Sequence, residues 1–222
     1  MKILIGQPKM EQHLEQFIQD IEANPAVDLI LYPEGYCQVT HLDKVKKLAK
    51  TFQTAVVMGY RNEQNVDRAL IIDKRGETLL DRAKTPETMP LFMPSTVVDD
   101  GHRYGYVLCR EIFMGLEGLK SEEPIQLIFN PIGVGMFSEE QYTDWSGEAK
   151  KIALQQRSII LGTSHADGSY RNCGHSIPMA YCFDETGEAI LLSKNDTRTR
   201  IVDTVLRTIE VLDSPVGTVQ WG

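Results

Sequence analysis

The feature that most constrains the fold is the hydrophobic periodicity, which changes twice along the chain. Residues 2–52 alternate short apolar runs with amphipathic stretches of helical spacing, and residues 104–212 largely repeat this pattern. Between these blocks, residues 55–83 follow a period of two with a turn at Asp73–Gly76, which predicts an antiparallel meander. A single α/β domain spanning residues 1–222, with mixed sheets and helices outside them, satisfies this order best. The expected helices are 11–22, 42–52, 112–120 and 145–157.

The expected strands are short, and several are apolar throughout, as in sheets covered on both faces. After the last of them, residues 214–222 are expected to form a tail. The strands are 2–5, 28–32, 55–60, 66–72, 78–83, 96–98, 106–108, 126–129, 158–163, 177–183 and 189–192, with one or two more within 200–212.

Composition excludes several classes of partner. The 222 residues carry a formal charge of −8, which argues against nucleic acid and anionic membranes as partners. No apolar run approaches the length of a membrane span, and the apolar start is too short for a signal peptide. The four cysteines match no zinc pattern, so we expect reduced thiols in a cytoplasmic protein. A bridge between Cys173 and Cys182 stays open at this stage.

Three reactive side chains follow predicted strands. The apolar run 106–108 leads into Cys109, the run 29–32 leads into Pro33 and Glu34, and the strand 78–83 ends at Lys84. Open α/β sheets bind ligands at the carboxyl ends of their strands. We therefore expect Glu34, Lys84 and Cys109 to converge into one hydrolytic site.

These three groups suit nucleophilic catalysis. A free thiol is mostly protonated at neutral pH, so a nucleophilic Cys109 needs a base, which Glu34 could supply. Lys84 and the backbone N–H of Arg110 could hold the charge that develops on the substrate oxygen, and one such donor is worth on the order of 3 kcal/mol. The intermediate is then a thioester, which water activated by Glu34 would hydrolyse.

The same residues resemble a known family. Glu34, Lys84 and Cys109, each within its local motif, resemble the Glu-Lys-Cys triad of the nitrilase, or carbon–nitrogen hydrolase, superfamily. The similarity covers nearly the whole chain, and the motifs stand in the family's order. The resembling motifs are Pro33–Gly35, Arg82–Thr85, Cys109–Glu111, Asn130–Pro131, Ala153–Ser158 with Gly162, and Gly174–Ser176 with Asp184–Gly187.

The resemblance implies a four-layer α-β-β-α sandwich that uses no metal and no cofactor. It implies hydrolysis of non-peptide C–N bonds in small molecules, as an amidohydrolase of linear amides or carbamoyl groups and, in some members, nitriles. It also implies homo-oligomers, dimers or larger, formed through the helix layers. Arg110 stands where simple nitrilases often carry a tryptophan, which favours an amide or carbamoyl substrate.

The sequence departs from the family pattern in the short loop between Lys84 and Cys109. Relatives carry a second active-site glutamate there, and Glu87 is the only glutamate available for that place. Arg110 and Met136 are further candidates for the substrate side. We expect Glu111 to pair with an arginine and orient its loop, which is a structural role.

Two other functions compete with a carbon–nitrogen hydrolase. A non-catalytic relative, a binding or scaffold protein that kept the fold, is compatible with the compressed loop. An isochorismatase-like cysteine hydrolase would use an aspartate, a lysine and a cysteine on a single parallel sheet. That class places its acid after the first strand, whereas Glu34 follows the second and a meander interrupts the order.

Overall fold

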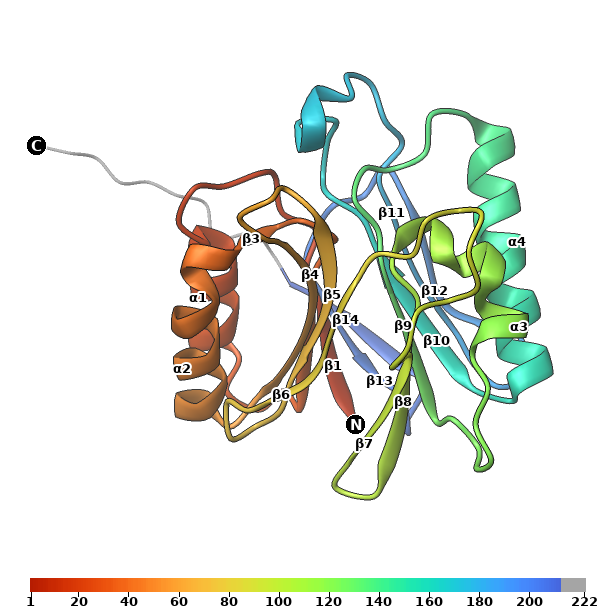
Figure 1. Cartoon of the computed structure of the whole chain (residues 1–222), viewed down its shortest axis with the longest axis horizontal. Helices are drawn as coiled ribbons and strands as arrows, with labels where there is room; N and C mark the ends of the chain where they lie inside the picture. Colours follow the sequence, from red (N-terminus) through yellow and green to blue (C-terminus); the bar gives the residue numbers. More distant parts are fainter. Residues whose placement is uncertain (213–222) are drawn as a thin grey trace, which may run out of the picture.

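The computed structural model, described for residues 1–212, consists of two β-sheets packed face to face with helices on both outer faces (Figure 1). Helices α1 (Glu15–Ala23) and α2 (Leu42–Phe52) cover the first sheet. Helices α3 (Gly115–Gly118) and α4 (Glu139–Gln156) cover the second. This is the expected α-β-β-α sandwich, and two separate sheets exclude the single parallel sheet of the isochorismatase-like alternative.

The first sheet has the order β14-β13-β1-β2-β4-β5-β6, and the short β3 also pairs with β4. Strands β1, β2 and β4 run parallel, and β4, β5 and β6 form the predicted antiparallel meander. The expectation of one or two late strands is confirmed with two. The bounds are β1 Lys2–Ile5, β2 Leu29–Leu31, β3 Cys37–Gln38, β4 Ala55–Arg61, β5 Asp67–Ile72, β6 Thr78–Ala83, β13 Arg200–Asp203 and β14 Thr208–Val211.

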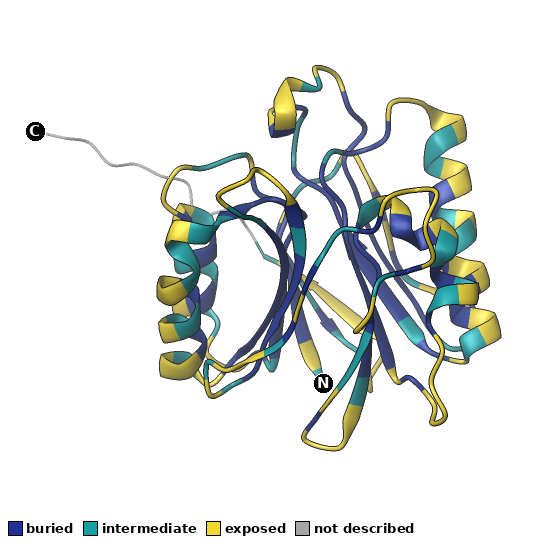
Figure 2. Cartoon of the chain, viewed as in Figure 1, coloured by how far each residue is buried: buried dark blue, intermediate teal, exposed yellow. Residues whose placement is uncertain are grey.

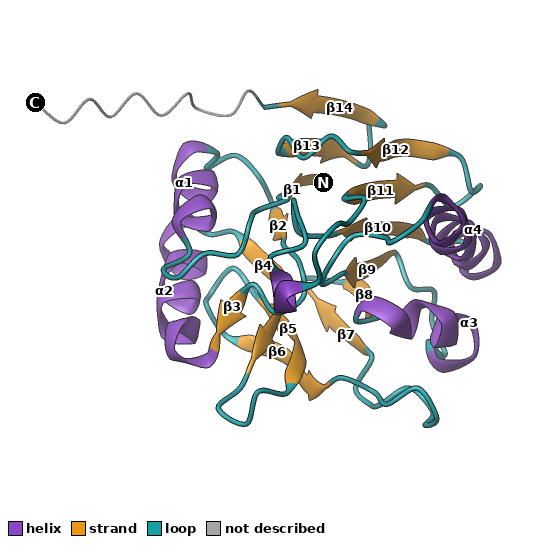
Figure 3. Cartoon of the chain, turned by 90° about the horizontal axis from the view of Figure 1, so that it is seen from above, coloured by secondary structure: helices purple, strands orange, loops and turns teal. Residues whose placement is uncertain are grey.

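The second sheet has the order β12-β11-β10-β9-β8-β7. Its three middle strands β8, β9 and β10 are parallel, and β11 and β12 form the predicted hairpin. Seen from above, the strands of both sheets lie between the helix layers (Figure 3). The bounds are β7 Thr96–Asp99, β8 His102–Tyr106, β9 Leu127–Pro131, β10 Ile159–Thr163, β11 Met179–Phe183 and β12 Ala189–Lys194.

Three helices differ from their predicted bounds. Helix α1 begins four residues later than expected, because Leu14 adopts a left-handed conformation (φ 64°) that interrupts the helical spacing. Helix α4 begins six residues earlier, because the Ser138 hydroxyl accepts a hydrogen bond from the N–H of Gln141 and caps it. The stretch expected as helix 112–120 divides into the 3₁₀ segment η2 (Cys109–Met114) and the single turn α3. Two other 3₁₀ segments are η1 (Val39–His41) and η3 (Tyr170–Asn172).

Buried apolar side chains form three layers. One cluster fills the space between the sheets, one lies between the first sheet and α1 and α2, and one lies between the second sheet and α4. Figure 2 shows the result, with buried strands between helices that expose only their outer faces. None of the described helices is both long and apolar enough to cross a bilayer. The expected tail 214–222 lies outside the described residues.

This topology brings several chain segments to one edge of the sandwich. Strands β2, β4, β8, β9 and β10 end there, and β6 ends there too, because it runs in the same direction as β4. Strand β5 runs in the opposite direction and therefore begins at this edge. Side chains that follow the ending strands, or that begin β5, can meet there.

Candidate active site

The structure brings Glu34, Lys84 and Cys109 together at this edge. The ammonium of Lys84 donates to Oε1 of Glu34 over 2.6 Å. The thiol of Cys109 lies close enough to the same carboxylate for each group to shift the pKa of the other, and the N–H of Gly133 lowers the pKa of the thiol. Glu34 thus lies between the amine and the thiol, although the three residues come from three distant segments of the chain.

The backbone at Cys109 is held in an unusual conformation. The expected strand does not reach the cysteine, because β8 ends at Tyr106 and Cys109 opens η2 with φ 54°. A non-glycine residue in the left-handed region is strained and needs support from its surroundings. The buried amide of Asn130 gives this support, because it donates to the carbonyls of Val107 (2.8 Å) and Cys109 (3.1 Å).

Glu111 forms a second carboxylate site beside the first. Its two oxygens accept from Nη1 and Nη2 of Arg82 at 2.8 and 2.7 Å. They also accept the backbone N–H groups of Thr85 and Leu108, both at 2.6 Å. This buried pair joins the end of β6 to the start of η2, the two segments that carry Lys84 and Cys109.

Close packing of glycines fixes the position of Glu34. A Cβ atom added at Gly59 would lie 2.6 Å from the Cα of Glu34, and one at Gly133 would lie 2.6 Å from its Oε2. On the main-chain side, Nε2 of the buried His165 is 3.0 Å from the carbonyl oxygen of Glu34. Glu34 therefore has little room to adopt another position.

Burial and neighbouring charges set the protonation of this site. Burial raises the pKa of Glu34, which Lys84 lowers and the negative charge of Asp67 raises again. Burial and Glu34 raise the pKa of Cys109 to about 12, against the opposing effects of Lys84 and the Gly133 N–H. Burial lowers the pKa of Lys84, but the charges of Cys109 and Glu34 outweigh it and raise that pKa. At neutral pH the site therefore holds a protonated thiol and an ammonium on either side of a carboxyl group of raised proton affinity.

The other sequence candidates lie outside this cluster. Glu87 is exposed and forms an ion pair of 2.9 Å with Arg110, so its carboxylate does not join the buried site. Met136 is buried in the core beneath α4, where its backbone pairs with Ile177. All four cysteines are free, which settles the question of a bridge between Cys173 and Cys182.

The sequence analysis missed a second group of residues at the site. Asp67 is buried and accepts from the hydroxyl of Tyr170 (3.1 Å), whose ring stacks on His165 with 5.2 Å between centroids. The sequence analysis did not select Asp67, because acidic side chains are usually exposed to solvent. The usable signal is topological, since β5 runs against β4 and β6 and must begin at the edge where they end.

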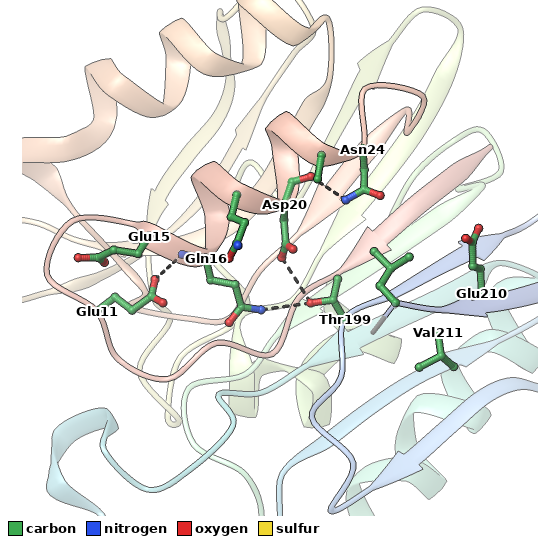
Figure 4. Close-up of a pocket in the computed structure, with 11 residues that line it drawn as sticks. Glu11, Glu15, Gln16, Asp20, Asn24, Thr199, Glu210 and Val211 are labelled. Atoms are coloured by element: carbon green, nitrogen blue, oxygen red, sulfur yellow. Dashed lines mark hydrogen bonds between the residues drawn. The ribbon is translucent and has the colours of Figure 1, made fainter. Parts of the chain in front are cut away.

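A cavity of about 620 Å³ lies elsewhere, beside α1 (Figure 4). Its walls come from α1, from the segment before it, and from β14 and the nearby Thr199. They include four carboxylates but none of the three residues Glu34, Lys84 and Cys109. The acidic members are Glu11, Glu15, Asp20 and Glu210.

No model of a known protein family matches the sequence, and no curated protein matches it significantly. Solved structures do match the fold. An amidase mutant from Nesterenkonia sp. AN1, with the acetamide moiety of fluoroacetamide added at its active-site cysteine, has a TM-score of 0.70 and 16% identity. That match covers 91% of this chain and 89% of the amidase.

Two further structures are similar. A CN-hydrolase superfamily protein from Xanthomonas campestris, with an arsenic adduct in its active site, has a TM-score of 0.74 and 12% identity, over 93% of this chain and 92% of that one. A carbon–nitrogen hydrolase from Helicobacter pylori G27 has a TM-score of 0.70 and 13% identity, over 93% and 90%. The chain therefore has the fold seen in the nitrilase, or carbon–nitrogen hydrolase, superfamily, as its motifs predicted.

Proposed function

We propose that this protein is a cysteine-dependent hydrolase of non-peptide C–N bonds, acting on small linear amides or carbamoyl compounds. The observation that carries the proposal is the position of the Glu34 carboxylate, which accepts from the ammonium of Lys84 and lies close enough to the thiol of Cys109 for each to shift the pKa of the other. The similar fold of an amidase that carries a covalent adduct on its active-site cysteine supports the same reading.

In the first half-reaction, the sulfur of Cys109 attacks the carbonyl carbon while its proton passes to Glu34. Because burial and Glu34 raise the pKa of the thiol, the nucleophile forms only as it attacks, rather than resting as a thiolate. Lys84 and the N–H of Arg110 stabilise the negative oxygen of the tetrahedral intermediate. Glu34 then returns the proton to the departing nitrogen, the C–N bond breaks, and a thioester remains.

In the second half-reaction, Glu34 takes a proton from water, which attacks the thioester carbon. The C–S bond breaks, the sulfur recovers its proton, and the carboxylic acid leaves. A base that takes and gives protons at neutral pH needs a pKa above that of an ordinary carboxyl group, and the burial of Glu34 acts in that direction. Every proton in the cycle thus passes through one carboxylate.

The direct test is a screen of small amides, carbamoyl compounds and nitriles, with mass spectrometry of the intact protein for an acyl adduct. We expect turnover of an amide or carbamoyl compound and a thioester on Cys109. The variant Cys109→Ala should lose both while its melting temperature stays within a few degrees. Absence of turnover and adduct across the screen would instead favour a binding protein that uses the same fold.

We also propose that the protein works in the cytoplasm as a homo-oligomer joined through its helix layers, without a nucleic-acid or membrane partner. The free state of the four cysteines fits a reducing compartment. Exposed apolar side chains at the second helix layer, Phe113 and Leu154, fit a contact between copies. Light scattering should show a dimer or larger, and the double change Phe113→Ser and Leu154→Ser should shift it towards monomer.

A further inference from the structure

Asp67 lies beside the lysine of the site in the sheet. It opens β5, pairs in register with Arg61 at the end of β4, and accepts the backbone N–H of Lys84 at 2.9 Å through its carbonyl oxygen. Both neighbouring strands therefore fix its backbone. Its side chain is only 3% exposed, so its carboxylate is placed within the protein rather than in solvent.

Three groups bind this carboxylate. Nε of Arg61 donates over 3.1 Å, Nη2 of Arg171 forms an ion pair, and the hydroxyl of Tyr170 donates over 3.1 Å. Two of these groups, Tyr170 and Arg171, belong to η3, a segment about a hundred residues further along the chain. Asp67 is thus the point where η3 is fastened to the first sheet.

Tyr170 contacts the surroundings of Glu34 directly. A Cβ atom added at Gly133 would lie 2.5 Å from Cε1 of Tyr170 and 2.6 Å from Oε2 of Glu34, so ring and carboxylate pack against the same glycine. The ring also crowds Gly35, the residue after Glu34, and stacks on His165, which bonds to the Glu34 carbonyl. Tyr170 therefore closes one side of the position that Glu34 occupies.

The segment that carries Tyr170 does not hold this position by its own geometry. Arg171 has φ 54°, which is strained for a residue with a long side chain, and Asn172 after it is also left-handed, a conformation that asparagine tolerates. The guanidinium groups of Arg61 and Arg171 lie 5.1 and 5.5 Å from the centroid of the Tyr170 ring. The anchoring contacts to Asp67 hold this conformation in place.

We propose that Asp67 is a positioning residue for the Glu34–Lys84–Cys109 site. It fastens Tyr170 against Glu34, and it adds a second negative charge beside the base. This inference rests on the proposed function and assigns a role to a residue outside the triad. Charged or titratable groups from several elements face Glu34 or its main chain, or surround Asp67. They are Lys84 directly after β6, Cys109 from η2, Asp67 from β5, Tyr170 and Arg171 from η3, Arg61 from β4 and His165 after β10.

The charge and the anchor have separate consequences. Removing the charge of Asp67 leaves Arg61 and Arg171 uncompensated, and both changes favour the ionised form of Glu34. The pKa of Glu34 should therefore fall, since Asp67 is one of the groups that raise it. Removing only the hydroxyl of Tyr170 keeps that charge but loosens η3.

The test measures the rate at which iodoacetamide alkylates Cys109 as a function of pH, so it needs no substrate. In the wild-type protein the rate should fall at low pH as Glu34 becomes protonated, which gives the pH–rate profile an acid limb. Asp67→Asn should lower the midpoint of this acid limb by about one pH unit. Tyr170→Phe should lower the plateau rate several-fold without moving the limb, and trypsin should cleave faster after the half-exposed Arg171.

Asp184→Asn is the matched control. Asp184 lies in the β11–β12 turn, is equally buried, and also pairs with an arginine, Arg207. It should leave both limb and plateau unchanged. Two results would overturn this inference and leave the proposed function intact. One is an unchanged pH–rate profile in Asp67→Asn, and the other is an unchanged plateau rate and unchanged trypsin cleavage in Tyr170→Phe. A wild-type Cys109 with no acid limb would overturn the proposed role of Glu34, and this inference with it. If Asp67→Asn does not fold, the Tyr170→Phe arm still decides the anchoring role.

Discussion

Glu34 and Glu111 are both buried in this protein, and their surroundings differ. Glu111 accepts two hydrogen bonds from Arg82 and two from backbone N–H groups, so both its oxygens are saturated with donors. Glu34 is equally buried but accepts from the single ammonium of Lys84, with the thiol of Cys109 near it. Glu34 therefore has fewer donors than Glu111, and its burial raises its pKa. The number of hydrogen-bond donors thus distinguishes Glu111, a structural carboxylate, from Glu34, the candidate base.

The two sites share their framework. Arg82 and Lys84 are two positions apart around the end of β6, and Cys109 and Glu111 are two positions apart in η2. The Arg82–Glu111 pair therefore fixes the spacing at which Lys84 and Cys109 meet Glu34. The Arg82–Glu111 pair thus supports the candidate active site, and substitutions of the two glutamates should have different effects.

The largest effect should come from Glu34→Gln, which keeps the shape of the side chain but removes the proposed base. We expect turnover to fall by about 10²–10⁴-fold, the usual contribution of general acid–base catalysis. The free energy of unfolding should change by no more than about 1 kcal/mol, because Lys84 is partly exposed and water can solvate its charge. Steady-state kinetics and urea denaturation on one preparation measure both. A large loss of stability in Glu34→Gln would show that Glu34, like Glu111, is needed for the structure.

The next effect should come from Glu111→Gln, and it should appear in stability. The change leaves the buried guanidinium of Arg82 without its partner, which typically costs about 3–5 kcal/mol. Urea denaturation measures this loss. Glu139→Gln is the control, because its pair with Lys194 is exposed and should contribute about 1 kcal/mol or less. Equal losses in the two variants would show that Glu111 is not a structural support.

Acid should also weaken the support of Glu34, because its carbonyl oxygen lies 3.0 Å from Nε2 of His165. Burial lowers the pKa of His165 from 6.5 to about 4. Between these values the unfolded chain binds a proton that the folded protein does not, so this stability is complete above about pH 6.5 and is lost as the pH falls towards 4. The loss should be on the order of 2–3 kcal/mol. Denaturation curves should show a weaker acid dependence in His165→Gln, and an unchanged dependence would contradict this reading.

The smallest effect should come from Gly133→Ala, which probes the packing around Glu34. The added methyl group would meet both Oε2 of Glu34 and the ring of Tyr170, at a cost of about 1–3 kcal/mol in stability and with a lower rate of Cys109 alkylation. Gly147→Ala in α4 is the control, since nothing lies within 4 Å of its added Cβ, and it should stabilise by up to about 1 kcal/mol. If Gly133→Ala changed neither the stability nor the alkylation rate, Glu34 would be free to move.

Local pattern was enough to predict much of this architecture. The apolar runs and their charged ends predicted the strands and the edge where Glu34, Lys84 and Cys109 meet, because strand direction alone carries such residues to one edge. Helix α4 was predicted six residues short, because its start depends on the Ser138 cap rather than on apolar spacing. That residues 1–222 form a single domain stays a prediction.

The parts of the site that sequence reasoning missed depend on contacts between distant residues. Asp67 is buried where Tyr170, 103 positions away, donates to its carboxylate. Glu87 is the nearest glutamate to Lys84 along the chain, yet it pairs with Arg110 at the surface. Neither the burial of one nor the exposure of the other has a local signature, so only the tertiary structure distinguishes the two acids.

The most direct test of the central claim compares the alkylation rates of the four cysteines in the folded protein, by mass spectrometry of peptides. Cys37 and Cys182 are buried and should be protected, so the decisive comparison is between Cys109 and the partly exposed Cys173. We predict that Cys109 reacts at least about ten times faster, and that Glu34→Gln and Lys84→Ala both remove this advantage. Equal rates at Cys109 and Cys173, unaffected by either substitution, would contradict an activated nucleophile at this site.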